Sequence, residues 1–392
     1  MKEDQTWEIL LEKVIIFTNE FYPFKGGIGR YCEELIIETV KNYQVTLVAP
    51  KYDGSFLKND LAEHISISFV EGGQFKYWHL PKLIKKVLSI DFTPYKHVLI
   101  ADWPFWVAIE LVNKYLPWKT KIKYSLMLHG SEILNLKNGR ASIFPKIIDL
   151  FSGTINIYTN SNYTKNILCE NHNVPATIPV EVTYLGVSQT ENVSNENYIA
   201  NVRNENFQLL SVGRLDDRKG FDNVIQAISL LDETVKSKIF FTIVGNGSNE
   251  YKETLKNLAK ENNVNLSILS GLNDNELNNC YNKTNLFILA ARNNNKKIEG
   301  FGLVFLEAAK FGVPSIATDV GAIKEVVKNN ETGFVVKEDV HELKNAIYNC
   351  YIDRDILIEF SKNCISNVKE FKWSTLANKT FPKTYGSKNE KH

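Results

Sequence analysis

The sequence predicts an α/β protein of two doubly wound, Rossmann-like domains that face a cleft. Three observations carry this prediction. Short runs rich in β-branched and aromatic residues alternate with helical patterns along the whole chain. Apolar residues predominate in most of these runs, which indicates parallel sheets buried on both faces. The length of 392 residues suits about two domains of ordinary size.

The predicted strands fall into two sets. In the first half they are Val14–Thr18, Val45–Ala49, Ile65–Phe69, Val98–Ala101, Ile122–Leu128 and Thr154–Thr159. In the second half they are Gln208–Val212, Phe240–Val244, Leu266–Ser270, Leu286–Leu289, Ser315–Thr318 and Phe334–Val336. A polar segment, Ser188–Asn206, separates the sets and is typical of a linker. We therefore expect an N-terminal domain over residues 1–190, a C-terminal domain over residues 191–372, and a closing helix at about 373–392 that can pack back on the first.

Composition excludes several classes of function. The chain has 46 basic and 45 acidic residues, so its net charge of +1 gives no overall field that attracts nucleic acid. The five cysteines have no metal-ligand spacing, which indicates reduced thiols in a cytosol. No run approaches the roughly 20 apolar residues of a membrane span, and the acidic N-terminal segment does not resemble a secretory signal. We expect a cytoplasmic protein.

Ligands of parallel α/β sheets bind beyond the carboxyl ends of the strands, so the loops there are the first candidates. The loop Phe21–Arg30 contains Gly26, Gly27 and Gly29 and leads into a predicted helix from about Ile28 to Val40. Glycines allow the backbone to approach a ligand, and the free N–H groups of a helix start attract phosphate. A tight strand-to-helix turn is the plainer alternative.

A second loop follows the first strand of the second half and precedes a predicted helix, Phe221–Leu231. It places Arg214 at the end of the strand and Lys219 just before the helix. A guanidinium fork and an ammonium point charge together suit a diphosphate. The alternative is a solvated charged turn in which Asp216 and Asp217 pair with the two cations.

The segment Glu299–Glu307 holds two carboxylates eight positions apart. If a helix begins near Gly302, Glu307 lies in its second turn and Glu299 lies on the loop before it. The free N–H groups of that helix start form an anion site between the two acids. Such a site suits a ligand with phosphates in the middle and hydroxyls at both ends, such as a nucleotide sugar.

Three further polar positions carry weaker signals. His129 follows a predicted strand, where its imidazole can bond a sugar hydroxyl or stabilise developing charge, although a structural histidine is the commoner case. Asp102 also follows a strand and either contacts an acceptor or caps a turn. Asp353-Arg-Asp355 matches an Asp-x-Asp metal pattern, but it lies within a helical pattern, so we expect a charged helix face and no metal.

The segment Leu80–Leu88 predicts an amphipathic helix, with Lys82, Lys85 and Lys86 opposite its apolar stripe and Trp78 beside them. A basic face with an aromatic side chain can attract anionic lipid headgroups. A surface helix packed on the sheet with solvated lysines is the alternative.

Together these motifs resemble the retaining glycosyltransferases of family 4, which have the GT-B fold. The resemblance covers nearly the whole chain and runs through Gly26–Gly29, His129–Gly130, Val212–Arg214, Lys219–Gly220, Glu299–Ala308, Ala317–Gly321, Glu325–Val327 and Thr332–Phe334. Each motif is weak alone, but their order is specific. One departure is Leu185, where the family commonly has Asn.

The resemblance implies a hexosyltransferase that moves sugar from a UDP- or GDP-linked donor to a glycan or lipid-linked acceptor. It implies retention of configuration, no metal or other cofactor, and a role in bacterial polysaccharide or glycolipid synthesis at the cytoplasmic face of the inner membrane. By this resemblance Arg214 and Lys219 bind the donor diphosphate. Glu307 holds the ribose hydroxyls, and Glu299 contacts hydroxyls of the transferred sugar.

The remaining expected roles also come from the resemblance. His129 lies near the reacting centre with a stabilising and positioning role, and the backbone of Gly26 and Gly27 approaches the phosphate. The backbone near the transferred sugar belongs to Phe301, Gly302 and Leu303. The donor base and sugar are recognised by loops such as Ser270–Leu272, in which Leu272 is the expected contact, and by the segment Arg292–Lys297.

Two other classes of function stay open at this point. One is a non-catalytic binding or scaffold subunit with the same fold. The other is a soluble sugar-nucleotide epimerase, or a glucan- or sucrose-type synthase, on that fold. Incubation with a donor alone discriminates an epimerase, because an epimerase needs no acceptor. The sequence does not predict the donor, the acceptor or the oligomeric state.

Overall fold

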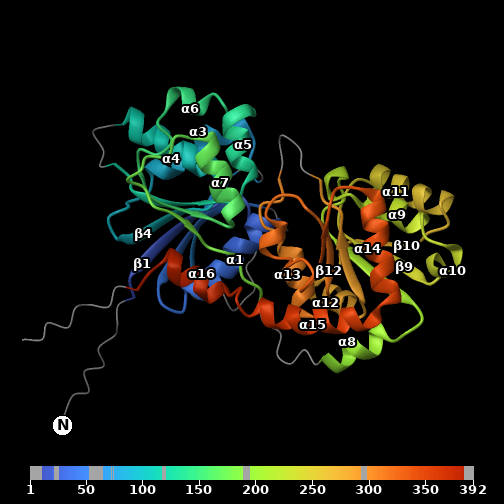
Figure 1. Cartoon of the computed structure of the whole chain (residues 1–392). Helices are drawn as coiled ribbons and strands as arrows, with labels where there is room; N and C mark the ends of the chain where they lie inside the picture. Colours follow the sequence, from blue (N-terminus) through green and yellow to red (C-terminus); the bar gives the residue numbers. More distant parts are fainter. Residues whose placement is uncertain are drawn as a thin grey trace, which may run out of the picture. The chain divides into compact units, whose positions relative to one another are not determined.

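The computed structural model describes residues 11–21, 26–52, 65–71, 73, 75–116, 121–188, 195–292 and 298–383 (Figure 1). Their contacts divide them into two compact units. The first contains the described residues up to Asn160, together with Thr164–Gly186 and those from Trp373 onward; the second contains Ser161–Tyr163 and Val187–Lys372. Each unit has one wholly parallel sheet with helices around it, which confirms the predicted fold class.

The first sheet has the strand order β3-β2-β1-β4-β5-β6-β7. Its strands are β1 Lys13–Phe17, β2 Gln44–Lys51, β3 Ile65–Glu71, β4 Tyr95–Ile100, β5 Tyr124–Leu128, β6 Thr154–Thr159 and β7 Val180–Val182. The order reverses between β1 and β4, the place where ligands of doubly wound sheets bind. The sequence did not predict β7, because three residues are too few for a periodic signal.

The helices that accompany this sheet are α1 Gly27–Thr39, η1 Tyr77–His79, α3 Leu80–Leu88, α4 Trp103–Tyr115, α5 Ser131–Asn138, α6 Phe144–Ile147, α7 Asn162–Asn171 and α16 Trp373–Thr380. The last of them packs on α1, although more than 330 positions separate the two in sequence. The hydroxyl of Tyr43 donates to the carbonyl of Pro382 over 3.0 Å, and the hydroxyl of Tyr158 donates to the carbonyl of Lys379 over 3.1 Å. These bonds attach the end of the described chain to the first unit.

The second sheet has the strand order β10-β9-β8-β11-β12-β13. Its strands are β8 Phe207–Val212, β9 Ile239–Val244, β10 Asn265–Leu269, β11 Leu286–Leu289, β12 Ser315–Thr318 and β13 Gly333–Val336. All six lie where the apolar runs predicted them. Residues of β11 are fully buried, as expected for a central parallel strand covered on both faces.

The helices of the second unit are α8 Asn195–Val202, η2 Asp217–Lys219, α9 Phe221–Ser229, α10 Glu233–Lys236, α11 Asn249–Glu261, α12 Asp274–Asn282, α13 Leu303–Lys310, η3 Ile323–Glu325, α14 Val340–Ile352 and α15 Arg354–Val368. The linker prediction was wrong in part, because α8 lies inside that segment. Tyr198 and Val202 stand one helical turn apart, both are buried, and α8 packs against α15. Two well-placed apolar residues outweigh the polar composition of the segment.

The Asp-x-Asp segment lies at the junction of α14 and α15. The carboxylate of Asp353 accepts hydrogen bonds from the backbone N–H groups of Asp355 and Ile356 and so caps α15. Asp355 pairs with Arg203 at 2.6 Å. Both acids therefore have structural partners.

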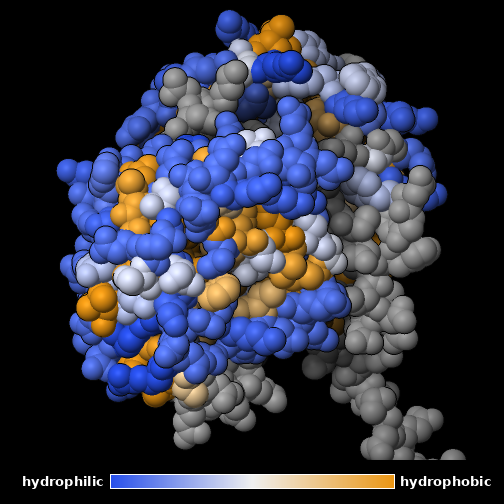
Figure 2. All heavy atoms as spheres, turned by 90° about the vertical axis from the view of Figure 1, so that its right-hand side faces the viewer, coloured by the Kyte–Doolittle hydropathy of each residue, from blue (hydrophilic) through white to orange (hydrophobic). Residues whose placement is uncertain are grey.

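Figure 2 shows one face of the molecule, on which hydrophilic residues predominate around a compact hydrophobic patch. The buried apolar residues lie instead on the strands and on the inner sides of the helices. None of the helices in the described part of the chain is long and apolar enough to cross a membrane.

Candidate functional site

The carboxyl ends of β8 and β11 lie side by side, because these strands pair in the second sheet. The loop after β8 leads through η2 into α9, and the chain after β11 leads to α13. Two segments about 80 residues apart in sequence therefore meet at one edge of the sheet. This is the edge where parallel α/β sheets bind ligands.

A buried ion cluster lies at this meeting point. The ammonium of Lys219 and Nη1 of Arg218 each lie 2.9 Å from Oε2 of Glu299. The three side chains are only 10%, 9% and 13% exposed. Lys219 and Glu299 were both predicted as site residues, but Arg218 was not.

The charge state of Glu299 follows from this cluster. Burial alone would raise the pKa of its carboxyl group, but the charges and hydrogen bonds of Lys219 and Arg218 outweigh burial and lower the pKa to about 2. Glu299 is therefore ionised throughout the neutral range. An ionised carboxylate only accepts hydrogen bonds, which suits it to hydroxyl groups.

Glycines fix the position of Lys219. Gly220 follows it with φ +65°, and a Cβ there would lie 1.8 Å from the carbonyl oxygen of Ala290, so only glycine fits. A Cβ on Gly213 would lie 3.4 Å from Cε of Lys219, which places the lysine stem along the loop just before Arg214. The glycines of the Val212–Arg214 and Lys219–Gly220 motifs thus have a packing role.

The backbone of Glu299 is held by the segment after β12. The N–H of Ala322 donates to the carbonyl oxygen of Glu299 over 3.0 Å. A Cβ on Gly321 would lie 2.1 Å from that same oxygen. The Ala317–Gly321 motif therefore supports the site through packing.

The start of α13 offers free backbone donors beside Glu299. The helix begins at Leu303 after Gly302, as predicted, with no side-chain cap and no acid in its first turn. Phe301 is buried and packs against Phe371, whereas Leu303 is half-buried. An uncapped helix start favours an anion through its N–H groups and its dipole.

Glu307 lies in the second turn of α13, also as predicted. The hydroxyl of Tyr281, from α12, donates to its Oε2 over 3.2 Å. Tyr281 is itself fully buried and stacks on Phe311. Its position on a polar helix gave no sequence signal for this contact.

The structure does not bring Arg214 into the ion cluster. Its side chain is 62% exposed, and its Nε lies 3.2 Å from Asp216. The alternative prediction for this loop was that Asp216 and Asp217 pair with the two cations. The structure shows this pairing for Arg214 and Asp216 but not for Lys219. An exposed arginine at the mouth of the loop remains free to turn toward an anion.

Leu272 lies farther along the same edge of the sheet, in the loop after β10 and two strands away from β8. Its loop is joined to the end of β9 by a 2.6 Å hydrogen bond from Ser270 to the carbonyl of Gly245. Residues 293–297 of the other expected recognition segment lie outside the described residues.

The first unit presents Gly26 and Gly27 at the start of α1. This helix has no side-chain cap and no acid in its first turn, and a Cβ on Gly27 would meet nothing within 4 Å among the described residues. No described side chain therefore occupies this helix start. Like the start of α13, it offers backbone N–H groups that can attract an anion.

His129 follows β5 with its ring held from two sides. Its Nε2 lies 3.2 Å from the carbonyl oxygen of Ala101, and its ring meets the edge of Tyr31 at a centroid distance of 4.9 Å. Burial lowers the pKa of His129, so its imidazole is neutral at neutral pH. A neutral ring that donates through Nε2 has Nδ1 as an acceptor. The carboxylate of Glu132 accepts from the backbone N–H groups of His129 and Gly130.

Asp102 has a structural role in the first unit. It is 4% exposed, and its carboxylate accepts from the backbone and side chain of Asn19 and from the hydroxyl of Thr18. It thereby joins the ends of β1 and β4. Burial raises its pKa from 3.8 to about 6, and the hydrogen bonds from Asn19 and Thr18 oppose that shift.

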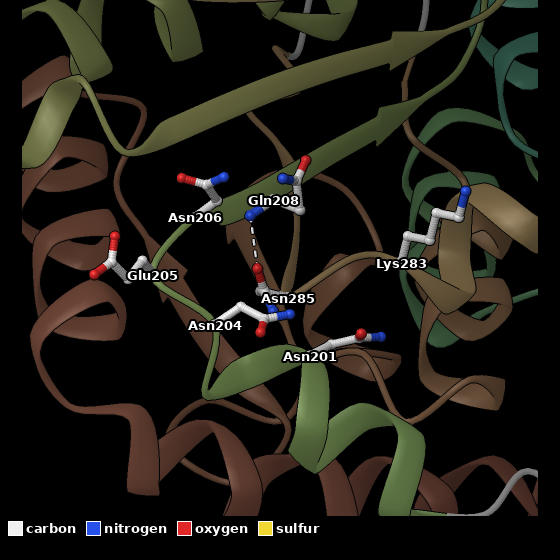
Figure 3. A pocket seen from close by; sticks show the side chains of 7 residues that line it. All are labelled: Asn201, Asn204, Glu205, Asn206, Gln208, Lys283 and Asn285. Carbon is white, nitrogen blue, oxygen red and sulfur yellow. Dashed lines mark hydrogen bonds between the residues drawn. The ribbon is translucent and has the colours of Figure 1, made fainter.

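A polar cavity of about 300 Å³ lies elsewhere in the second unit (Figure 3). Its lining residues are Asn201, Asn204, Glu205, Asn206, Gln208, Lys283 and Asn285. It adjoins the amino end of β8, whereas the ion cluster follows the carboxyl end of that strand. The cavity is thus separate from the candidate donor site.

Within the described residues, no group of three or more His, Cys, Asp and Glu side chains is placed to hold a metal ion. The charged cluster at Glu299 instead combines one carboxylate with two cations.

The family comparisons match both halves of the chain. Residues 25–191 match the model of Glycosyltransferase Family 4, and residues 194–371 match that of Glycosyl transferases group 1. Together the two models cover most of the chain, which therefore belongs to glycosyltransferase family 4. A curated relative from Mycobacterium tuberculosis, a GDP-mannose-dependent α-(1-6)-phosphatidylinositol monomannoside mannosyltransferase, is 26% identical over 94% of this chain and 97% of its own.

Similar solved structures support the same fold. The HepE protein of Anabaena, in complex with UDP and glucose, has a TM-score of 0.71 at 17% identity and covers 94% of this chain and 98% of its own. The sucrose-phosphate synthase of Thermosynechococcus elongatus has a TM-score of 0.73 at 18% identity, covering 94% and 97%. WaaG, a glycosyltransferase involved in lipopolysaccharide biosynthesis, has a TM-score of 0.68 at 16% identity, covering 93% and 98%.

Proposed function

We propose that this glycosyltransferase transfers a hexose from a UDP- or GDP-linked donor to a glycan or lipid-linked acceptor, with retention of configuration. We place this reaction in bacterial polysaccharide or glycolipid synthesis. The observation that carries the proposal is the cluster of Lys219, Arg218 and Glu299 beside the uncapped start of α13. It offers cations, backbone donors and a carboxylate in one place.

Each part of the cluster suits one part of such a donor. Lys219 turns from Glu299 to the diphosphate and acts there with Arg214. The freed acceptor positions of Glu299 bind hydroxyls of the transferred sugar, and Glu307 binds those of the ribose. We assign the binding of phosphate charge to the N–H groups at Gly302 and Leu303, and to those after Gly26 and Gly27 in the first unit.

The reaction follows from this arrangement. The bond from the anomeric carbon to the diphosphate oxygen breaks, and negative charge grows on the departing phosphate. Lys219, Arg214 and the helix start stabilise that charge where it develops. In a retaining reaction the acceptor attacks from the face of the leaving group, so the leaving phosphate can take the acceptor proton. His129, which is neutral, then acts by positioning the sugar.

We also propose that no metal ion takes part. Divalent cations neutralise leaving diphosphates in many transferases, whereas here we assign that task to the side chains of Lys219 and Arg214. Activity measured after exhaustive chelation should equal that of the untreated protein. A complete loss that added Mg²⁺ or Mn²⁺ restores would contradict metal independence.

The donor and pathway rest on the relatives. The mycobacterial relative is named for GDP-mannose, and the Anabaena structures contain UDP or UDP-glucose. WaaG is described as acting in lipopolysaccharide biosynthesis. A thermal-shift screen of nucleoside diphosphates and nucleotide sugars identifies the donor, because a ligand of the folded state raises the melting temperature.

Lys219→Ala tests the assignment of the phosphate clamp. Turnover with the identified donor and acceptor should fall by about 100-fold or more, because a charge-assisted contact is lost in the transition state. Lys236→Ala is the matched control, since Lys236 is also a buried lysine paired with a glutamate, Glu233, in the same unit. Normal turnover in Lys219→Ala with a normal fold would disprove the clamp.

We further propose that the first unit contacts an anionic membrane surface through an exposed apolar patch. The patch consists of Tyr77, Trp78, Ile143 and Ile147, which are 38%, 70%, 57% and 39% exposed. The ring of Trp103 lies between the two segments, with centroids 5.8 Å from Tyr77 and 6.5 Å from Phe144. Ring contacts therefore link the two segments that carry the exposed residues.

Exposed lysines lie close in sequence to the residues of this patch, and their charge would complement anionic headgroups. They are Lys76, Lys82, Lys85 and Lys146.

Co-sedimentation with phosphatidylcholine vesicles, with and without phosphatidylglycerol, tests the proposal. We expect binding only to the anionic vesicles, and its loss in Trp78→Ser with Ile143→Ser. The control is Leu230→Ser with Ile352→Ser, two exposed apolar residues of the second unit. Equal binding by both double variants would reject the patch.

A further inference from the structure

Arg218 is bonded to the same carboxylate oxygen as Lys219. Both cations lie 2.9 Å from Oε2 of Glu299 and both are about nine-tenths buried. Arg214, in contrast, is 62% exposed. The sequence predicted a role for Arg214 but none for Arg218. In the structure it is Arg218 that contacts the predicted site residue Glu299.

The main chain also fixes Arg218. Its carbonyl oxygen accepts a 2.7 Å hydrogen bond from the N–H of Arg292, just after β11. Its side-chain Nε is buried and has no hydrogen-bond partner among the described residues. The contact to Glu299 is therefore the one ion pair that the described residues give this guanidinium.

The cluster carries an excess positive charge. Two cations share one carboxylate, and among the described residues these two are the charged groups that lower the pKa of Glu299. The uncharged Gly321 and Ala322 lie against its backbone. An anion that enters the site can therefore recruit one cation without leaving Glu299 unpaired. An unpaired buried carboxylate would be costly.

Lys219 is the cation placed to leave. Its stem lies along Gly213, directly before Arg214, and an ammonium on a flexible chain is easily redirected. Arg218 has a planar guanidinium with a rigid fork of donors, and its carbonyl oxygen is bonded to the N–H of Arg292. The two side chains therefore differ in shape and in flexibility, although both are buried to the same extent.

We propose that Arg218 is a positioning residue, which keeps Glu299 ionised and in place while Lys219 moves from the carboxylate to the donor diphosphate. This inference rests on the proposed function and assigns a role beyond it. Arg218 acts on the sugar through Glu299 and does not touch the phosphate.

Loss of Arg218 has a specific consequence. Glu299 then depends on Lys219 alone, so its pKa rises when Lys219 turns to the donor. Protonation of Glu299 removes an acceptor for the sugar hydroxyls at a pH where the wild type keeps it. A purely structural role would lower activity equally at every pH.

The experiment compares Arg218→Met and Arg218→Lys with the wild type in pH profiles of kcat/KM for the identified nucleotide sugar. In Arg218→Met we expect kcat/KM at neutral pH to fall about 10- to 100-fold, through misplacement of Glu299. The acid limb should move up by about one pH unit or more. Arg218→Lys should restore most of the wild-type acid limb. The affinity for the nucleoside diphosphate alone should change by less than about threefold.

Arg203→Met is the control, because Arg203 is an exposed arginine whose partner, Asp355, lies outside the site. If the wild type binds and turns over a nucleotide sugar but Arg218→Met keeps the wild-type acid limb, the inference alone fails. If diphosphate affinity falls as much as kcat/KM, Arg218 is a phosphate ligand and the inference is overturned. A wild type that binds no nucleotide sugar rejects the proposed function as well.

Discussion

The hydroxyl of Tyr281 is the one part of that side chain that reaches Glu307; its ring packs against Phe287 and Phe311. Burial and the nearby carboxylate raise the pKa of Tyr281 well above 10, so the hydroxyl stays protonated and donates. Tyr281→Phe keeps the packing and removes the hydrogen bond. We expect the Kd for nucleoside diphosphate to rise about tenfold, as for a hydrogen bond to a charged group, with little change in kcat.

A second measurement ties this effect to the ribose. Titration with 2′-deoxy nucleoside diphosphate should show a smaller difference between the wild type and Tyr281→Phe, because the hydroxyl that Glu307 binds is missing. Tyr251→Phe is the control, since the hydroxyl of Tyr251 is buried and has no hydrogen-bond partner among the described residues. An unchanged Kd in Tyr281→Phe would mean that this tyrosine does not position Glu307.

Asp102 gives the stability of the first unit a pH dependence. Its pKa is raised in the folded state, so its contribution to the free energy of unfolding is complete below its usual pKa of 3.8 and is lost as the pH rises through about 6. The difference between the wild type and Asp102→Asn should therefore fall by about 2–3 kcal/mol from pH 3.5 to pH 7. Urea denaturation at a series of pH values measures it. Other titrating groups cancel in that difference, so parallel pH curves for the two proteins would contradict the shift.

At the scale of single residues, the sequence indicated candidate residues but not the contacts between them. Glycines and charges at strand ends identified Lys219 and Glu299 as site candidates. Their ion pair was not predictable, because it depends on how two loops about 80 residues apart meet. Arg218 was missed because a cation in a charged turn is usually solvated, and only the fold shows that this one is buried.

The connection from β8 to α9 is the element on which the candidate site most depends. Gly220 has φ +65°, and a Cβ there would lie 1.8 Å from the carbonyl oxygen of Ala290. Gly271 has φ +74° but has nothing within 4 Å of its Cβ position. Gly271→Ala should therefore cost only the backbone strain of about 1–2 kcal/mol. Gly220→Ala has both strain and a backbone clash, so it should cost more and displace Lys219.

Chemical denaturation of both variants, with donor affinity as a second readout, tests this pair. The expected pattern is a loss of stability in both variants that is larger in Gly220→Ala, together with a larger loss of donor affinity in Gly220→Ala than in Gly271→Ala. Equal loss of stability in the two variants would mean that the turn at Gly220 relaxes and avoids the clash with Ala290 at no cost in free energy.

Helices and strands were predictable where their hydrophobic pattern was long or where the element was buried on all sides. Buried parallel strands such as β9 and β11 are runs made almost entirely of apolar residues, which is typical of strands covered on both faces. Helix α8 was missed because its two buried residues, Tyr198 and Val202, stand among polar ones. Amphipathic helices are recognised by their stripe, and a stripe of two residues is too short to detect.

At the scale of the whole molecule, the described chain ends in a helix that belongs to the unit in which the chain begins. Trp373, Leu376 and Phe381 are buried, and the hydroxyls of Tyr43 and Tyr158 donate to carbonyls between Lys379 and Pro382. A chain that stops at Lys372 loses all of these contacts. The second unit keeps its whole sheet, from β8 to β13.

We therefore expect this truncation to destabilise the first unit alone. Three large buried side chains at about 1.5–3 kcal/mol each make a loss of about 5 kcal/mol or more reasonable. In hydrogen exchange followed by mass spectrometry, peptides from β1, α1 and β2 should exchange faster, and peptides from β8, β9 and β12 should not change. A chain that ends at Lys383 keeps the contacts and is the control. Faster exchange throughout both sheets would show instead that the two units unfold as one, since loss of α16 would then affect strands that it does not touch.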